Sequence, residues 1–404
     1  MVFRAPGPGP IRPVRGRGAS RSAVALTTGA TAGYDCGRTV TDVEPDVLGP
    51  PYERHTIDLG TDDEGAVVAT LVRRRADRPT GRAVLYVHGF VDYFFQTHVA
   101  DFFVERGWDF YALDLRKYGR SLLPHQTPNF CCDLSDYFPE LDAAVEIVRA
   151  DGHDTVLGMG HSTGGLILSV WEHARRAAGG VDGLVLNSPF FDINAPWLVR
   201  RPLVAAVARL GRRAPRRILP LGLATVYGES LHADHHGEWS YDLAWKPLGG
   251  FPVRAGWLNA IRNAQRQLRS GLAIPVPVLL ACSTRSFRGR RWQESAALAD
   301  AVLDVEHMVR WAPRLGPHVT LARFDGGMHD LTLSGPAVRE RVFAEVGRWA
   351  EAFLATGPTT AGPDAASAGA VSGAAGAVSG AAGSLPGSRR PADADPAGVA
   401  ATSG

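Results

Sequence analysis

The segment that most constrains the fold runs from Thr155 to Gly165, with the sequence TVLGMGHSTGG. Its first residues are mainly apolar and predict a buried strand, whereas the apolar side chains over 166–171 recur at helical spacing. Between the two, Ser162 is flanked by Gly160 and Gly164, which leave room where a Cβ would collide with neighbouring backbone. A serine at such a strand-to-helix turn is presented at the end of a sheet. The sequence therefore predicts either a reactive Ser162 or a serine that only caps the helix.

Strand-like and helix-like segments alternate around this motif. Apolar runs that predict strands lie at 66–72, 83–87, 109–114 and 184–186. Apolar residues at helical spacing mark 99–103 and 134–149. Such alternation predicts an α/β fold, a mainly parallel sheet with helices on both faces. In sheets of this kind the chemistry gathers at the carboxyl ends of the strands.

The alternation stops after Ser188-Pro189. Residues 191–274 are irregular, apart from a helix-like stretch at 203–210, and predict an inserted cap above the edge of the sheet. Strand patterns resume at 276–281 and 319–324, and the pattern over 337–353 predicts a closing helix.

Both ends of the chain differ in composition from its centre. Residues 1–50 are rich in Pro, Gly and Arg, and residues 356–404 are almost entirely small or polar, with an internal repeat at 370–383. The C-terminal segment has few large side chains to bury against the entropy of ordering it, and the N-terminal segment lacks periodicity, so we expect both to be disordered. One folded domain is therefore predicted over 51–355.

Charge and composition exclude several classes of partner. The net charge of +2 gives no global field that favours nucleic acid or an anionic membrane. Apolar runs are too short for a signal-peptide core or a membrane span. The four cysteines lack metal-ligand spacing, and their scarcity fits a reducing compartment. We therefore expect a cytoplasmic location with no nucleic acid partner and no stable membrane insertion; the oligomeric state stays open.

A reactive serine needs a base, because its hydroxyl is a poor nucleophile at neutral pH. His329, in the sequence FDGGMHD, directly follows the last predicted core strand. A loop at that position lies at the same sheet edge as Ser162. His329 is therefore the predicted base, with a surface-loop histidine as the alternative.

Taken together, Gly160-His161-Ser162-x-Gly164-Gly165, the preceding His88-Gly89 and the terminal His329 resemble the α/β-hydrolase fold. The glycine-rich motif looks like the branch that contains monoacylglycerol lipases and lysophospholipase-like esterases. The resemblance covers about 83–353. The segment DLRKYGRS at 114–121 is similar to that branch's D-x-R-G-x-G-x-S loop, with Lys117 where glycine is usual. The resemblance implies a serine hydrolase of small-molecule esters that needs no cofactor and no metal.

The resemblance also implies a third catalytic residue, an acid. The family's acid follows a core strand directly, but here 283–291 carries no acid at that spacing. The later stretch ADAVLDVE is similar to the family's D-x-V-V-D-x-E, displaced by an insertion, and this match assigns Asp300 as the acid. Asp304 would then cap the helix 305–311. Asp304 and Asp192 remain alternatives for the acid.

Ester cleavage also needs donors for the developing oxyanion. The family supplies them from the amide after the nucleophile and from the loop after the third strand, which here are the backbone N–H groups of Thr163 and Phe90. His88 is expected to brace that loop rather than react.

Three other features leave alternatives open. Residues 232–238 (HADHHGE) resemble metal ligands in type but not in spacing, so a polar cap loop is expected. Asp234 and Glu238 could instead capture a free amine, as in an amide or peptide hydrolase resembling proline iminopeptidases. A hydrolase-fold binding protein without activity is the third possibility. Aromatic residues suited to an apolar acyl pocket are Phe94, Phe95, Phe190, Phe191, Trp197, Trp239, Trp245 and Trp257.

Overall fold

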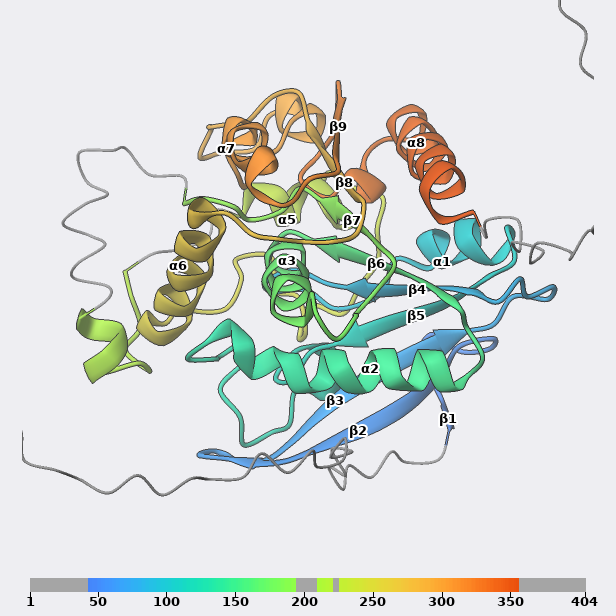
Figure 1. The fold of residues 1–404 in the computed structure, drawn as a ribbon. Coiled ribbons are helices and arrows are strands. Elements are labelled where there is room, and N and C mark those ends of the chain that lie inside the picture. The colour runs from blue at the N-terminus through green and yellow to red at the C-terminus, as the bar shows by residue number, and fades with distance from the viewer. Residues whose placement is uncertain (1–42, 194–208, 221–224, 356–404) are drawn as a thin grey trace, which may run out of the picture. The chain divides into compact units, whose positions relative to one another are not determined.

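The computed structural model describes residues 43–193, 209–220 and 225–355, and Figure 1 gives their arrangement. Within these ranges a sheet of nine strands has the order β1-β2-β3-β5-β4-β6-β7-β8-β9. Strands β1 to β3 pair antiparallel, whereas β4 to β9 run parallel to one another. The strands are β1 (Glu44–Pro45), β2 (Glu53–Asp62), β3 (Gly65–Arg74), β4 (Arg82–Val87), β5 (Trp108–Asp114), β6 (Thr155–His161), β7 (Gly183–Asn187), β8 (Val278–Ser283) and β9 (Val319–Phe324). The predicted mainly parallel sheet is confirmed.

Helices cover both faces of this sheet. On β4 the apolar side chains alternate: Ala83 and Leu85 join the core beneath α2, α3 and α6, whereas Val84 and Tyr86 join the core beneath α1 and α8. The helices are α1 (Thr97–Val104), α2 (Phe138–Ala150), α3 (Thr163–Arg175), α5 (Val226–Leu231), α6 (Ala255–Ser270), α7 (Val305–Trp311) and α8 (Pro336–Leu354). Short 3-10 turns lie at Gly119–Ser121, Leu134–Tyr137, Glu294–Leu298, Ala312–Arg314 and Leu331–Leu333. None of the helices in the described ranges is long and apolar enough to cross a membrane.

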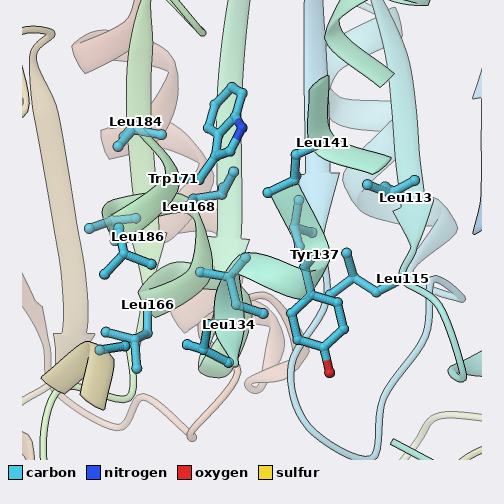
Figure 2. Packing of buried hydrophobic residues seen from close by; sticks show 14 of the residues in the cluster. Leu113, Leu115, Leu134, Tyr137, Leu141, Leu166, Leu168, Trp171, Leu184 and Leu186 are labelled. Atoms are coloured by element: carbon cyan, nitrogen blue, oxygen red, sulfur yellow. The ribbon is translucent and has the colours of Figure 1, made fainter. Parts of the chain in front are cut away.

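The helix after Ser162 is buried against the centre of the sheet. Figure 2 shows Leu166, Leu168 and Trp171 of α3 beside Leu184 and Leu186 of β7, and all five side chains are at most 1% exposed. Burying a large apolar side chain contributes about 1.5–3 kcal/mol. Because these contacts hold α3 against the sheet, the turn that precedes it has a fixed position.

Two predicted boundaries change. Residues 43–50, predicted to be flexible, belong to the fold: they include β1, and Asp46 accepts hydrogen bonds from Arg120 at 2.7 Å and 2.9 Å. A two-residue strand and one buried carboxylate leave no periodic pattern in a sequence, which explains the difference. The predicted helix over 134–149 is a 3-10 turn followed by α2. Residues 1–42 and 356–404 and most of the helix predicted over 203–210 lie outside the described residues.

Lys117, which stands where the similar family has glycine, has a positive φ of 65°. This left-handed backbone disfavours a residue with a Cβ. Its buried ammonium, however, lies 2.5 Å from the Asp62 carboxylate and 2.6 Å from that of Glu64, at the tip of the β2–β3 hairpin. Glu64 also accepts a hydrogen bond from the Thr127 hydroxyl. These contacts offset the strain and tie the hairpin to the loop after β5.

This cluster makes stability depend on acid pH. Burial alone would raise the pKa of Glu64, but hydrogen bonds from Lys117 and Thr127 outweigh it and lower the pKa from 4.5 to about 2. Because the folded-state pKa lies below the unfolded one, the stabilisation is present above about pH 4.5 and is lost as the pH falls toward about 2. We expect Glu64→Gln to flatten the dependence of Tm on pH in this window. Exposed Glu351→Gln is the control, and parallel curves for wild type and Glu64→Gln would contradict the assignment.

Candidate active site

The turn that carries Ser162 is strained and held by backbone hydrogen bonds. Ser162 has φ 51° and ψ −113°, a backbone conformation that residues with a side chain rarely adopt. Its amide donates to the carbonyl of Asn187 at 2.9 Å, and its carbonyl accepts from the amide of Phe190 at 3.0 Å. Both partners lie at or just after the carboxyl end of β7. The neighbouring strand thus fixes the conformation that presents the serine hydroxyl.

His329 and Asp300 meet Ser162 at this edge of the sheet. The His329 Nε2 atom lies 3.0 Å from Ser162 Oγ, and its Nδ1 atom lies 2.9 Å from Asp300 Oδ2. The three residues are 8%, 2% and 0% exposed for Ser162, His329 and Asp300. A serine, a histidine and an acid connected in this order can pass the serine proton to the imidazole while the acid holds the ring's orientation.

Backbone contacts hold the Asp300 carboxylate in place. Its Oδ1 atom accepts from the amides of Val302 and Leu303, both at 2.8 Å, which leaves Oδ2 facing His329. The insertion before Asp300 also holds the backbone of Asp300. The amide of Asp300 donates to the carbonyl of Arg285, and the carbonyl of Asp300 accepts from the amide of Phe287. These contacts with the insertion therefore help to place the Asp300 carboxylate beside His329.

The two alternative acids have other partners. Asp304 caps α7 by accepting from the amide of Glu306, and it pairs with Arg288 at 2.7 Å. Asp192 pairs with Arg269 at 2.7 Å and accepts from the indole N–H of Trp311 at 3.3 Å. Of these three described acids, Asp300 is the one in contact with His329.

The two amides predicted to bind an oxyanion lie next to Ser162. Thr163 is the first residue of α3. Phe90 follows Gly89, where an added Cβ would lie 3.1 Å from the Ser162 Cβ. Among the described residues neither amide has a hydrogen-bond acceptor, as a donor to an oxyanion requires. His88 bridges its loop to the residue that follows β5, with Nδ1 2.8 Å from the carbonyl of Gly89 and Nε2 accepting from the amide of Leu115. These contacts fit the predicted bracing role of His88.

Of the predicted aromatic set, Trp257 is buried in the core and contacts the site through Phe90. Phe90 stacks on Trp257 of α6 with ring centroids 3.9 Å apart, and Tyr227 of α5 packs edge-on against His329 at 5.3 Å. Phe94 and Phe191, predicted as pocket residues, are instead fully buried in the two cores. Phe95, Trp239 and Trp245 gather in a small cluster with Met328 and Leu333. Trp197 lies outside the described residues. The periodicity of the sequence did not distinguish aromatic residues that line the site from aromatic residues packed in the core.

The histidine-rich segment 232–238 does not converge on one point. His236 stacks on Trp292 with centroids 3.6 Å apart, His232 packs against Tyr241, and the side chain of Asp234 is 81% exposed. In the described part of the chain, no group of three or more His, Cys, Asp or Glu side chains is placed to hold a metal ion.

Sequence reasoning missed a buried polar cluster beside the site. We call Asp92, His161, Lys246 and Asp330 the inner charge cluster; all four residues are buried. Two of its members adjoin predicted site residues, since His161 precedes Ser162 and Asp330 follows His329. This adjacency in the sequence could have identified His161 and Asp330. No comparable signal marks Lys246, which lies in the predicted cap.

Comparison with known proteins places the chain among related sequences and folds. Residues 78–336 match the profile of the family described as serine aminopeptidase, S33. Comparison with curated proteins gives no significant match.

Three solved structures illustrate the likeness. A monoacylglycerol lipase from Paleococcus ferrophilus is 19% identical, with a TM-score of 0.50 over 69% of this chain and 97% of that one. A soluble variant of monoglyceride lipase from Saccharomyces cerevisiae, in complex with a substrate analog, is 15% identical, with a TM-score of 0.55 over 71% and 92%. A carboxyl esterase from Bacillus coagulans is 14% identical, with a TM-score of 0.53 over 74% and 99%. At these identities the likeness concerns the fold.

Proposed function

Since this chain belongs to the serine aminopeptidase S33 family and has the α/β-hydrolase fold that its sequence predicted, we propose that it is a serine hydrolase of small carboxylic esters. The observation that carries the proposal is the hydrogen-bonded chain from Ser162 through His329 to Asp300. The names of the structural neighbours, two lipases of monoacylglycerols and a carboxyl esterase, support an ester as substrate.

The reaction proceeds through an acyl-enzyme. Ser162 Oγ forms a bond to the acyl carbon as its proton passes to His329 Nε2. The amides of Phe90 and Thr163 stabilise the oxyanion, and Thr163 at the start of α3 adds the helix dipole. The alcohol leaves with the proton from His329. Water then attacks the acyl-enzyme with His329 again as base, the bond between Ser162 Oγ and the acyl carbon breaks, the carboxylic acid leaves, and His329 returns the proton to Ser162.

The alternative of an aminopeptidase draws support from the family's description. Such an enzyme needs an acid that captures a free amine. Glu238 already pairs with Arg339, and Asp234 is turned to solvent, so neither cap acid proposed for this role is buried or free beside Ser162. This arrangement favours the ester hydrolase.

A fluorophosphonate probe tests the proposal directly. We expect labelling of the wild type and none of Ser162→Ala, because the probe reacts with an activated serine. A wild type that stays unlabelled would support the alternative of an inactive binding protein.

Ester and amide substrates separate the two enzymatic alternatives. We expect turnover of p-nitrophenyl esters, with a preference among acyl chain lengths set by the apolar wall of Phe90 and Trp257. Faster turnover of amino-acid p-nitroanilides than of the esters would favour the aminopeptidase, and a flat chain-length profile would remove the apolar acyl pocket from the proposal.

A further inference from the structure

Lys246 is a buried cation that the cap delivers to the candidate active site. Its Nζ atom lies 2.5 Å from Asp92 Oδ1, and the two side chains are 8% and 1% exposed. Moving a charged group from water into the protein interior is unfavourable unless the group is paired. Here the surrounding structure holds Lys246 and Asp92 together as such a pair. Lys246 lies in the inserted cap, whereas Asp92 lies in the loop that carries Phe90.

Asp92 connects this cation to the nucleophile and to the oxyanion loop. Its Oδ2 atom lies 3.2 Å from His161 Nδ1 and 3.4 Å from the amide nitrogen of Gly89. His161 directly precedes Ser162, and its ring centroid lies 5.0 Å from that of His329. One carboxylate therefore contacts the cap, the residue before the nucleophile and the residue before Phe90.

A second contact seats the same cap segment on the same loop. The amide of Asp242 donates to the hydroxyl of Tyr93 at 2.8 Å, and the amide of Lys246 donates to the carbonyl of Asp242. The ammonium of Lys246 also lies within 6.0 Å of the ring centroids of Phe95, Tyr227 and Tyr241. Tyr227 in turn packs against His329. The cap thus touches the site through an ion pair and through an aromatic wall.

We propose that Lys246 is a positioning residue that couples the cap to catalysis: through Asp92 it fixes the loop of Gly89 and Phe90 and the ring of His161. The proposal rests on the proposed function, because it assigns to Lys246 an effect on the oxyanion donor of that reaction. It gives the cap a role in completing the site besides covering substrate.

The charge of Lys246 also acts on His161. The groups that face His161 are Asp92 from its loop, Asp330 after β9, Lys246 from the cap and His329. Burial lowers the pKa of His161, but the two carboxylates outweigh it and raise the pKa, while Lys246 opposes them. Without Lys246, His161 should stay protonated to higher pH. A protonated His161 beside His329 disfavours the imidazolium that acyl transfer requires.

Four variants test the role of Lys246 with p-nitrophenyl butyrate as substrate. We expect Lys246→Met to lower kcat by about 100-fold, the effect of a misplaced catalytic group, with KM changed little. Its low-pH limb of kcat/KM should move to higher pH. The double variant Asp92→Asn/Lys246→Met should recover about tenfold of that loss, because the unpaired carboxylate is then removed as well. Lys246→Arg should recover part of it. Lys117→Met, which removes an equally buried lysine elsewhere, should lower Tm without changing kcat.

Hydrogen–deuterium exchange gives a readout that does not depend on activity. We expect faster exchange over residues 88–96 in Lys246→Met but not in Lys117→Met. Unchanged exchange would overturn the inference even if the protein is not a hydrolase. If the wild type is labelled by the fluorophosphonate and Lys246→Met keeps its kcat, the inference fails while the proposed function stands. A rise in KM for anionic esters alone, with kcat unchanged, would also overturn it and would make Lys246 a substrate-binding cation.

Discussion

Replacing Asp300 with asparagine should lower kcat by about 10⁴-fold, the loss expected when the acid of such a triad no longer sets the histidine tautomer. The geometry gives the reason. Two amides, those of Val302 and Leu303, donate to Oδ1 of Asp300, so the carbonyl oxygen of an asparagine must occupy that position. Its NH₂ group would then face Nδ1 of His329. The ring would have to carry its proton on Nε2, where it could donate to Ser162 but not accept from it.

The alternative acids serve as matched controls for this result. Asp304→Asn should keep kcat within a few-fold, because the contacts of Asp304 are to the start of α7 and to Arg288. Asp192→Asn should also retain turnover, since Asp192 pairs with Arg269. Initial rates on a nitrophenyl ester, with Tm measured for each variant, separate loss of chemistry from loss of folding. Near-wild-type turnover by Asp300→Asn would overturn its assignment as the acid.

The sequence predicted the sheet and the candidate triad for identifiable physical reasons. Strands buried on both faces leave continuous apolar runs such as 83–87, and the turn at Ser162 requires glycines at fixed positions. These requirements are local, so a single sequence displays them. Asp300 was harder to predict, because it follows an insertion and was found only through a family pattern. Its distance from His329 depends on the path of the chain between Ser286 and Asp300.

The inner charge cluster could not be predicted in the same way. Lys246 and Asp92 are 154 residues apart in the sequence, and no periodic pattern connects a cap loop to a strand end. The same holds for Asp46 and Arg120, whose buried ion pair extends the fold toward the N-terminus. Pairs of this kind depend on the tertiary structure alone. Sequence patterns report backbone geometry and burial, whereas they say little about which distant charges meet.

Replacing Gly164 with alanine should strongly lower the reactivity of Ser162, although it leaves the three triad side chains unchanged. A Cβ at this position would lie 2.4 Å from the carbonyl oxygens of both His88 and Val87, whereas real Cβ contacts are essentially never shorter than 3.0 Å. Neither oxygen can move easily, because Val87 lies in β4, which pairs with β5 on one side and with β6 on the other, and the ring of the adjacent His88 is held by Gly89 and Leu115. The added methyl group must therefore push the start of α3, with Ser162, away from the loop of Phe90.

We expect Gly164→Ala to lower the rate of fluorophosphonate labelling by at least about 100-fold, the effect of a displacement near 1 Å at a reacting group. It should also cost about 1–3 kcal/mol of unfolding free energy, as overpacking of a buried site does. Gly249→Ala is the control, because its Cβ would meet only the Thr225 methyl at an ordinary 3.8 Å. Labelling of Gly164→Ala at the wild-type rate would mean that β4 and α3 can separate without disturbing Ser162, and close packing at Gly164 would then not be what positions the nucleophile.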